Sequence, residues 1–174
     1  WLLNPAAGTD ADGVEIEYGH MDFLVDADID NVGLGLGWRG WRAVAVRSSY
    51  AVDVPVRTAW DPDGTGEIAK GRDRMTVVGV SYDFARLAAP GSGLRLVLGT
   101  AYRHYQTEND AGETSWQGSQ GTLDAGATLG WHQVFTGARM AADLAFTRQN
   151  ATDESISFGT LLSTLPRIWR FGVA

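Results

Sequence analysis

The stretch NVGLGLGWRGWRAVAV, residues 31 to 46, decides the fold class of this chain. Val32, Leu34, Leu36 and Trp38 occupy every second position, and a glycine stands between each of them and the next. Alternation with a period of two is typical of a β-strand whose two faces meet different environments. Glycine weakens a strand and packs against nothing, so a face that meets water usually carries Thr, Lys or Glu instead. The stretch therefore raises the question of which environment each face meets.

The composition describes one domain of ordinary size and excludes several classes of function. The chain has 174 residues, 44% of them hydrophobic, so residues 1 to 174 can form a single domain with a sizeable core. Acidic residues outnumber basic residues by 21 to 14, which argues against a nucleic-acid partner because such a protein needs a basic surface. Cysteine is absent, so disulfides, thiolate catalysis and cysteine-ligated metals are excluded.

Two further features bear on the environment of the chain. Lys70 is the only lysine among the basic residues, which is unusual for a soluble β protein that must cover a sheet face with charge. No apolar run approaches the roughly 20 residues of a membrane-spanning helix, and no signal peptide opens the sequence. The sequence therefore excludes a helical membrane protein.

Period-two alternation recurs along the whole chain and predicts eight strands. Each has one apolar face and one face of small or charged residues. The predicted strands are residues 14 to 23, the first half of the opening stretch, 41 to 57, 75 to 87, 94 to 107, 121 to 135, 138 to 149 and 167 to 174.

The connections between these strands alternate between short and long. Short glycine-containing links occur at WRGW, APGSG and TG, whereas the links at 24 to 31, 58 to 73, 108 to 120 and 150 to 166 are longer and polar. Short turns at one end and long acidic loops at the other are typical of a transmembrane β-barrel. We therefore predict an all-β fold, an antiparallel up-and-down transmembrane β-barrel. Eight strands are visible, and they either close a small barrel or belong to a larger one.

The two faces of the strands favour a lipid environment over a soluble one. A soluble, lipocalin-like ligand-binding barrel would turn its apolar faces inward and leave a water face of glycine and alanine. In a membrane barrel, the apolar faces meet lipid and aromatic residues near the strand ends form interfacial girdles. The predicted lipid-facing girdle consists of Trp38, Tyr82, Tyr102, Trp131 and Trp169.

Three segments resemble the FadL-like superfamily of outer-membrane barrels, particularly its PorV and PorQ branch. LLNPAAG, residues 2 to 8, is similar to the Asn-Pro-Ala signature that precedes the first strands in that superfamily. GTLDAGATLGW, 121 to 131, is similar to a strand in which an inward Asp precedes a glycine-rich apolar run. LPRIWRFGVA, 165 to 174, is similar to a Leu-Pro-Arg segment that re-enters the membrane.

The resemblance implies a non-enzymatic protein of the bacterial outer membrane. Family members commonly have about fourteen strands, so the resemblance implies that residues 1 to 174 are a barrel domain incomplete at both ends. The fatty-acid transporters imply conduction of hydrophobic small molecules through a porin-like wall. The PorV branch implies a structural or secretion-associated role in a surface complex. The implied partners are outer-membrane lipid, hydrophobic small molecules and other proteins of such an assembly.

Charged residues on the small-residue face form a further predicted site. They either line a path through the barrel or form a mutually neutralising network that stiffens its wall, and mixed signs on neighbouring strands favour the network. By simple parity, the lumen-lining charged network consists of Glu15, Glu17, Arg39, Arg47, Asp53, Asp83, Arg95, Arg103, Asp124, Asp143 and Arg170.

The histidines and serines carry no catalytic signature. His20, His104 and His132 invite comparison with outer-membrane lipid hydrolases, and Ser49 or Ser81 would be the nucleophile on the lumen-facing side. No Gly-x-Ser-x-Gly turn is present, so we predict no catalytic residue and no enzyme activity.

Two acidic clusters have spacings close to those of calcium-binding loops. They are Asp26, Asp28 and Asp30, and Asp61, Asp63 and Glu67. Neither completes the pattern, because Asn31 replaces the glycine of the sharp turn in the first cluster and Arg72 occupies the twelfth position in the second. We therefore interpret both as solvated acidic loops and predict no metal and no cofactor, with divalent bridging to anionic lipid as the alternative.

Overall fold

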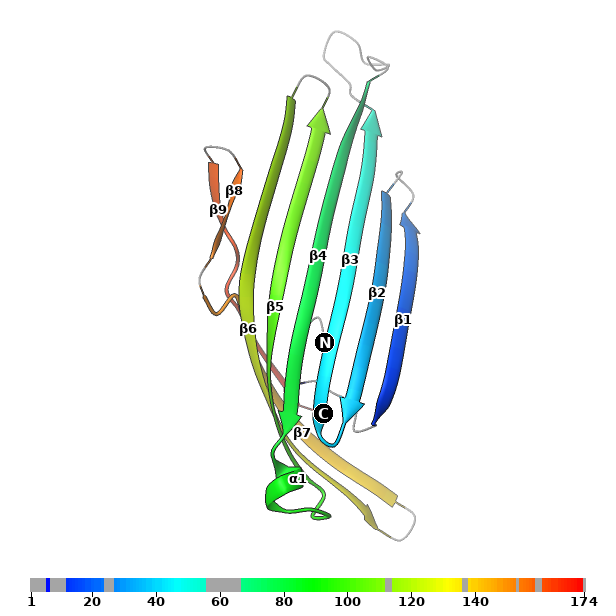
Figure 1. The fold of residues 1–174 in the computed structure, drawn as a ribbon, viewed down its shortest axis with the longest axis vertical. Helices are drawn as coiled ribbons and strands as arrows, with labels where there is room; N and C mark the ends of the chain where they lie inside the picture. The colour runs from blue at the N-terminus through cyan, green and yellow to red at the C-terminus, as the bar shows by residue number, and fades with distance from the viewer. Residues whose placement is uncertain are drawn as a thin grey trace.

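Eight antiparallel strands form one curved sheet that dominates the fold (Figure 1). The computed structural model describes residues 6, 12–23, 27–55, 67–111, 114–135, 138–152, 154–158 and 161–173. The strands of the sheet, in spatial order, are β1 (Gly13–Phe23), β2 (Ala27–Trp38), β3 (Trp41–Pro55), β4 (Ile68–Asp83), β5 (Leu94–Ala111), β6 (Thr114–Phe135), β7 (Ala138–Gln149) and β10 (Ile168–Val173). A separate hairpin contains β8 (Ser155–Phe158) and β9 (Leu161–Thr164). The prediction of an all-β, antiparallel up-and-down fold is confirmed.

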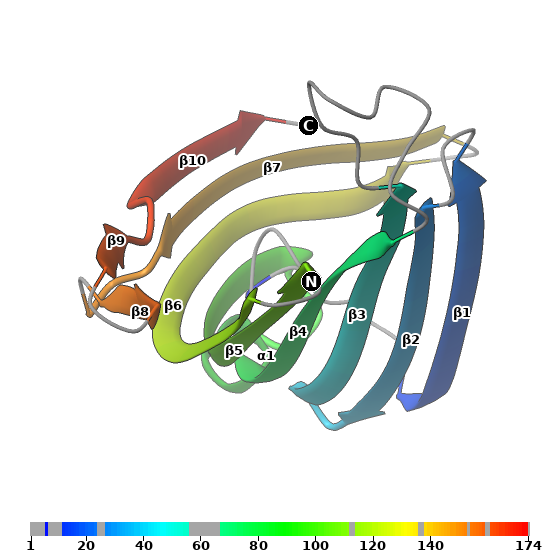
Figure 2. The same ribbon diagram turned by 90° about the horizontal axis from the view of Figure 1, so that it is seen from above.

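The sheet bends into a trough with a concave and a convex face (Figure 2). β1 and β10 are its two edges, and they do not pair with each other in the described part of the chain. The sheet is therefore not the closed eight-stranded barrel that the sequence left open. We call the end of the sheet with residues 39 and 40, the helical turn α1 (Ala85–Ala88) and the last residue of β6 the turn end, and we call the opposite end the loop end.

A two-residue turn between β2 and β3 fixes the register of the sheet. Arg39 and Gly40 have φ angles of 49° and 88°, as a type I′ hairpin turn requires, and glycine adopts such an angle without steric cost. Trp38 therefore lies opposite Trp41, and Leu36 lies opposite Ala43. Because the turn has two residues, even-numbered side chains of β2 share a face with odd-numbered side chains of β3.

The link between β4 and β5 is held by one buried carboxylate. Asp83 is 7% exposed, and its Oδ1 accepts hydrogen bonds from the backbone N–H of Ala85 at 3.0 Å and of Leu96 at 3.2 Å. β4 ends at Asp83, and α1 follows immediately, although the sequence predicts a strand up to residue 87. The backbone leaves the extended conformation here because the carboxylate binds the first free N–H of the helical turn.

The strands reach further beyond the apolar region than the sequence predicts. β5 and β6 continue through most of residues 108 to 120, so this predicted loop is largely strand, and β4 already begins at Ile68, within the predicted loop of residues 58 to 73. These segments were predicted as loops because they are polar, but backbone hydrogen bonds between strands form regardless of side-chain polarity. Lys70 lies opposite Asp110, an arrangement of opposite charges that supports cross-strand pairing.

The buried residues of the sheet lie on the concave face. Val77, Val97 and Ala101 are 0%, 4% and 2% exposed, and pairing places Val77 on the same face as Arg103. Side chains on this face shield one another because the curvature brings neighbouring strands together. The concave face is therefore the core of the fold.

Two glycines in the turn after α1 provide a test of this geometry. Gly91 and Gly93 have φ angles of 82° and 75°, so alanine at either position should cost about 1 kcal/mol of unfolding free energy. A Cβ at Gly93 would also lie 2.0 Å from the carbonyl oxygen of His132, whereas a Cβ at Gly91 meets nothing within 4 Å. We expect Gly93→Ala to lose about 2 kcal/mol more than Gly91→Ala in equilibrium urea unfolding. Equal losses would contradict the pairing of Gly93 with β6.

Candidate functional site

Apolar side chains cover the convex face from one edge strand to the other. Pairing places Ile16 beside Leu34, and it places Tyr82 beside Leu98. The exposed fractions are 78% for Ile16, 45% for Leu34 and 46% for Leu98. We call this surface the apolar band. Its large members are Val14, Ile16, Tyr18, Val32, Leu34, Leu36, Trp38, Trp41, Val78, Val80, Tyr82, Leu94, Leu96, Leu98, Tyr102, Leu123, Leu129, Trp131, Met140, Leu144, Phe146, Trp169, Phe171 and Val173.

The apolar band crosses the strands obliquely. The hydrogen-bonded row that starts at Phe146 on β7 passes through β6, β5, β4 and β3 and ends at Trp38 on β2. On β7, the residue of the band nearest the loop end is Phe146. On β2, the residue of the band nearest the loop end is Val32, which lies six residues beyond the end of this row at Trp38. The border of the band is therefore displaced by six residues, about 20 Å, along the strands over a width of five strand spacings, about 24 Å. The strands are therefore inclined by roughly 40° to the normal of the band.

The predicted aromatic residues all lie on the convex face. Pairing places Trp38, Tyr82, Tyr102, Trp131 and Trp169 among the members of the apolar band. The sequence prediction missed Trp41, whose ring centroid lies 4.6 Å from that of Tyr82. Its position directly after the two-residue turn was a usable signal, because a residue opposite Trp38 must share its face.

A buried ion pair organises the concave face. Arg103 donates from Nε and Nη2 to Oδ2 of Asp124 at 2.9 and 2.7 Å, and the two side chains are 7% and 1% exposed. The other oxygen of Asp124, Oδ1, accepts the backbone N–H of Asn150 at 3.0 Å. Burial of two opposite charges in direct contact satisfies both, so the pair joins β5 and β6 to the residue that follows β7.

Asn150 extends this contact to the connection between β7 and β10. Its Nδ2 donates to the carbonyl oxygen of Leu165 at 2.9 Å, and its Oδ1 accepts the backbone N–H of Glu154 at 2.9 Å. Its φ angle is 51°, a conformation that asparagine tolerates better than most residues. Asp124 therefore positions the connection that contains β8 and β9.

Side chains of the neighbouring strands fill the space beside the glycines of β2. A Cβ at Gly35 would lie 3.1 Å from Nη2 of Arg42 and 3.4 Å from Oε2 of Glu15. Gly33 lies in the same way beside Glu17 and Val46. Arg42 and Glu15 form an ion pair across β2, and a side chain at Gly35 would press against both partners.

A third charged contact lies at the turn end. Nε2 of His132 lies 3.0 and 2.9 Å from the two carboxylate oxygens of Asp143, and Gly130 leaves room for that carboxylate. Contacts between basic side chains and carboxylates therefore occur at several points along the described part of the concave face: near β1, at the centre and near the end of β6.

The structure divides the predicted charged network. Glu15, Glu17, Asp83, Arg95, Arg103, Asp124, Asp143 and Arg170 lie on the concave face. Three predictions are wrong. Arg39 lies in the two-residue turn with its guanidinium 5.2 Å from the ring of Trp38, and Arg47 and Asp53 share the convex face with Ala45. The assignment by simple parity failed because the odd-numbered residues of β3 share a face with the even-numbered residues of β2, and the prediction placed them on the opposite face.

The same error misplaced several neutral residues of β3 and hid Arg42. Val44 and Val46 lie on the concave face, where Val44 is 5% exposed, although alternation in the predicted strand 41 to 57 places these two valines on its apolar face. Ser49 lies on the convex face instead of the lumen-facing side. Arg42, the partner of Glu15, was missing from the predicted set for this reason. The length of the hairpin turn was the signal that would have identified it.

His20 lies outside the apolar band, beyond Tyr18 towards the loop end of β1. Its ring nitrogens lie 2.8 Å from Asp30 and 2.7 Å from Asp22. The hydrogen bond to Asp30, together with the negative charge of Asp22, raises the pKa of His20 above its ordinary value. Neither Ser49 nor Ser81 hydrogen-bonds to a histidine in the described part of the chain.

The acidic clusters are only partly described. Asp26, Asp61 and Asp63 lie outside the described residues. Asp28 and Asp30 lie on β2, where Asp30 contacts His20. Within the described ranges, no group of three His, Cys, Asp or Glu side chains is arranged to hold a metal ion. None of the helices among these residues is long and apolar enough to cross a membrane.

Comparison with protein-family models, curated protein sequences and solved structures finds no match to this chain. The site is therefore defined by its own geometry, an apolar convex face and a polar concave face on one sheet.

The buried ion pair gives a test of the concave core. Asp124→Ala should lower the free energy of unfolding by about 3–5 kcal/mol in urea, because it leaves Arg103 buried without a carboxylate. Asp22→Ala is the control, since its contact with His20 is largely exposed and should contribute far less to stability. Combining Arg103→Met with Asp124→Leu should recover part of the loss. Similar losses for Asp124→Ala and Asp22→Ala would refute the central role of the pair.

Proposed function

We propose that this chain forms part of the wall of a non-enzymatic β-barrel in the bacterial outer membrane. The apolar band faces the hydrocarbon of the lipid, and the concave face lines the interior. The observation that carries the proposal is the continuity of the band across all eight strands, opposite a face with a buried ion pair. Soluble monomers rarely expose apolar patches larger than a few hundred Å², and here such a patch runs across the convex face of all eight strands of the sheet.

The dimensions of the apolar band support a membrane-spanning role. On β5 the band runs from Leu94 to Tyr102, and on β6 it runs from Leu123 to Trp131, nine residues in each case. A tilted transmembrane strand needs about 9–11 residues. The inclination of roughly 40° also agrees with the strand tilt of about 35–45° in outer-membrane barrels.

The curvature of the sheet argues against the soluble, lipocalin-like alternative. A soluble ligand-binding barrel encloses its apolar side chains, which must then lie on the concave face. Here the large apolar side chains lie on the convex face, and the buried groups of the concave face include Arg103, Asp124 and Thr147.

The polar concave face favours a structural or secretion-associated role over conduction of hydrophobic small molecules. A path for apolar substrates needs apolar walls, whereas Arg42, Arg103 and His132 each contact a carboxylate on this face. The partners we propose are outer-membrane lipid and other proteins of a surface assembly. The finer assignment to the FadL-like superfamily stays a prediction from the three similar segments.

The direct test is the need for a lipid-like environment. We expect the protein to require detergent or lipid for folding and to migrate differently on a gel before and after heating in detergent. A monodisperse monomer obtained without detergent would overturn the proposal.

A matched pair of variants tests which face meets lipid. Leu98 lies in the middle of the apolar band on β5, and arginine there should reduce the free energy of folding into phosphatidylcholine vesicles by about 2–4 kcal/mol. Ser115→Arg places the same charge on the same face of β6 beyond the band, where the cost should be about 0–1 kcal/mol. Both variants are measured by urea titration in vesicles. If Leu98→Arg is no more costly than Ser115→Arg, lipid does not cover the band.

A further inference from the structure

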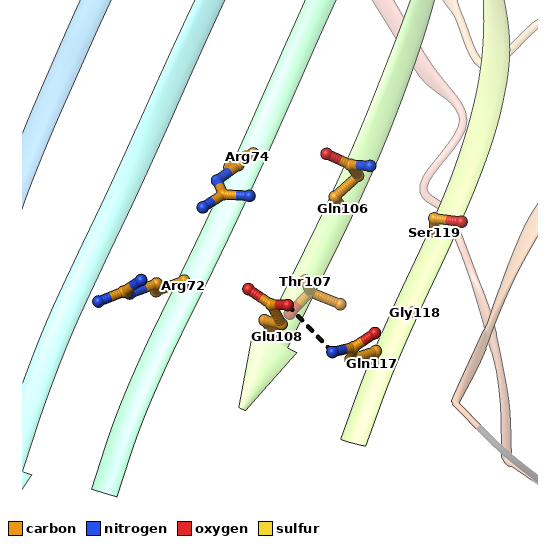
Figure 3. A pocket seen from close by; sticks show the side chains of 8 residues that line it. All are labelled: Arg72, Arg74, Gln106, Thr107, Glu108, Gln117, Gly118 and Ser119. Atoms are coloured by element: carbon orange, nitrogen blue, oxygen red, sulfur yellow. Dashed lines mark hydrogen bonds between the residues drawn. The ribbon is translucent and has the colours of Figure 1, made fainter. Parts of the chain in front are cut away.

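A cavity of about 230 Å³ lies beyond the apolar band, towards the loop end (Figure 3). Its side chains come from three neighbouring strands, β4, β5 and β6. Arg74, Gln106 and Ser119 form one hydrogen-bonded row across these strands. All three share the convex face with Val78 and Tyr102, so the cavity continues the surface of the band.

The cavity is rich in hydrogen-bond donors. The second row across it consists of Arg72, Glu108 and Gln117. Glu108 is its one carboxylate, and that group accepts a hydrogen bond from Nε2 of Gln117 at 3.0 Å. In Figure 3 the guanidinium of Arg72 turns away from Glu108 towards β3. The arginines, amides and hydroxyl of the two rows therefore favour an anionic ligand.

Three arginines of this region have no carboxylate partner within the described residues. Neither Arg72 nor Arg74 forms an ion pair there, and the same holds for Arg47, which lies opposite Thr76 on the convex face. By contrast, Arg42 and Arg103 on the concave face each contact a carboxylate. Convex-face arginines without partners, next to a donor-rich cavity, indicate a ligand that supplies the negative charge.

Arg74 and Arg72 lie on β4 just beyond the apolar band, near the expected headgroup layer of a membrane. Arg74 is four residues beyond Val78 on β4, which places it about 10 Å above the band on a strand tilted by roughly 40°. An arginine side chain extends several ångströms and orients its charge towards the interface. The headgroup region on each side of the hydrocarbon core is about 5–8 Å thick. The backbone of Arg74 therefore lies about 2–5 Å outside the headgroup layer, within the reach of its side chain, and Arg72 begins about 5 Å farther out.

We propose that this cavity binds the phosphate-bearing headgroup of an anionic lipid. Arg72 and Arg74 contact the phosphate, because the planar guanidinium fork matches two phosphate oxygens. The acyl chains lie over Val78, Tyr102 and Leu123 in the adjoining band. This inference rests on the proposed membrane location and identifies one class of lipid at that surface.

The test uses the full chain in nanodiscs of equal parts phosphatidylcholine and phosphatidylglycerol. Native mass spectrometry measures the ratio of the two lipids that stay bound to the released protein. We expect phosphatidylglycerol to predominate, and Arg72→Gln combined with Arg74→Gln to reduce this preference about tenfold, as expected for loss of charge-assisted hydrogen bonds. Arg95→Gln combined with Arg170→Gln removes the same charge from the concave face and should leave the preference unchanged.

Three outcomes would overturn the inference. They are an unchanged preference in the Arg72 and Arg74 variant, an equal loss in the concave-face control, and calorimetric binding of inorganic phosphate in phosphatidylcholine nanodiscs as tight as that of phosphatidylglycerol. Gel migration before and after heating is measured on each sample. Failure to enter nanodiscs refutes the membrane location, whereas normal insertion without lipid preference refutes the headgroup site alone. Arg72→Lys with Arg74→Lys, which keeps the charge, should fold and retain most of the preference.

Discussion

Cross-strand pairing is the constraint on which the rest of the structure depends. Each residue of a strand points to one of two faces, and pairing carries that choice across the sheet without exception. The type I′ turn at Arg39 and Gly40 places Trp38 opposite Trp41, and the register then runs unbroken from β1 to β10. A shift of one residue anywhere would move a row of leucines and valines into the charged concave face. The alternation is therefore both the cause of the apolar band and the reason that it is continuous.

The concave face has the opposite requirement, since charged groups at its centre, such as Arg103 and Asp124, are buried. Glycine and threonine leave room there, and the remaining space is filled by pairs that neutralise one another. Asp124 shows how much one such residue connects, because its two oxygens bind Arg103 of β5 and the backbone of Asn150 beyond β7. The small residues of the opening stretch have the same explanation, as Gly35 lies directly beneath the contact between Glu15 and Arg42.

Sequence alternation predicted the strand order and the apolar face because both depend on local periodicity. The alternation placed Asp124 and Arg103 on the same face. Their contact, however, depends on the register between β5 and β6, and the sequence of either strand alone does not determine that register. The prediction failed on β3, where the valines of the concave face resemble an apolar outer surface and only the length of the preceding turn distinguishes the two. It also failed beyond the band, because polar strands such as the start of β4 lack the apolar signal that periodicity needs.

A membrane location also places a requirement on the backbone groups at the two edges of the sheet. β1 and β10 each bear part of the apolar band, with Ile16 on one and Phe171 on the other, and each has one side without a paired strand in the described part of the chain. Lipid offers no hydrogen-bond partners, so backbone N–H and C=O groups at hydrocarbon depth must be satisfied by protein. Loops or helices would not continue the band at these edges, whereas further antiparallel strands with the same alternation would. A membrane location therefore requires β-strand partners on both edges, and the inclination of the band fixes the direction in which such strands must be displaced.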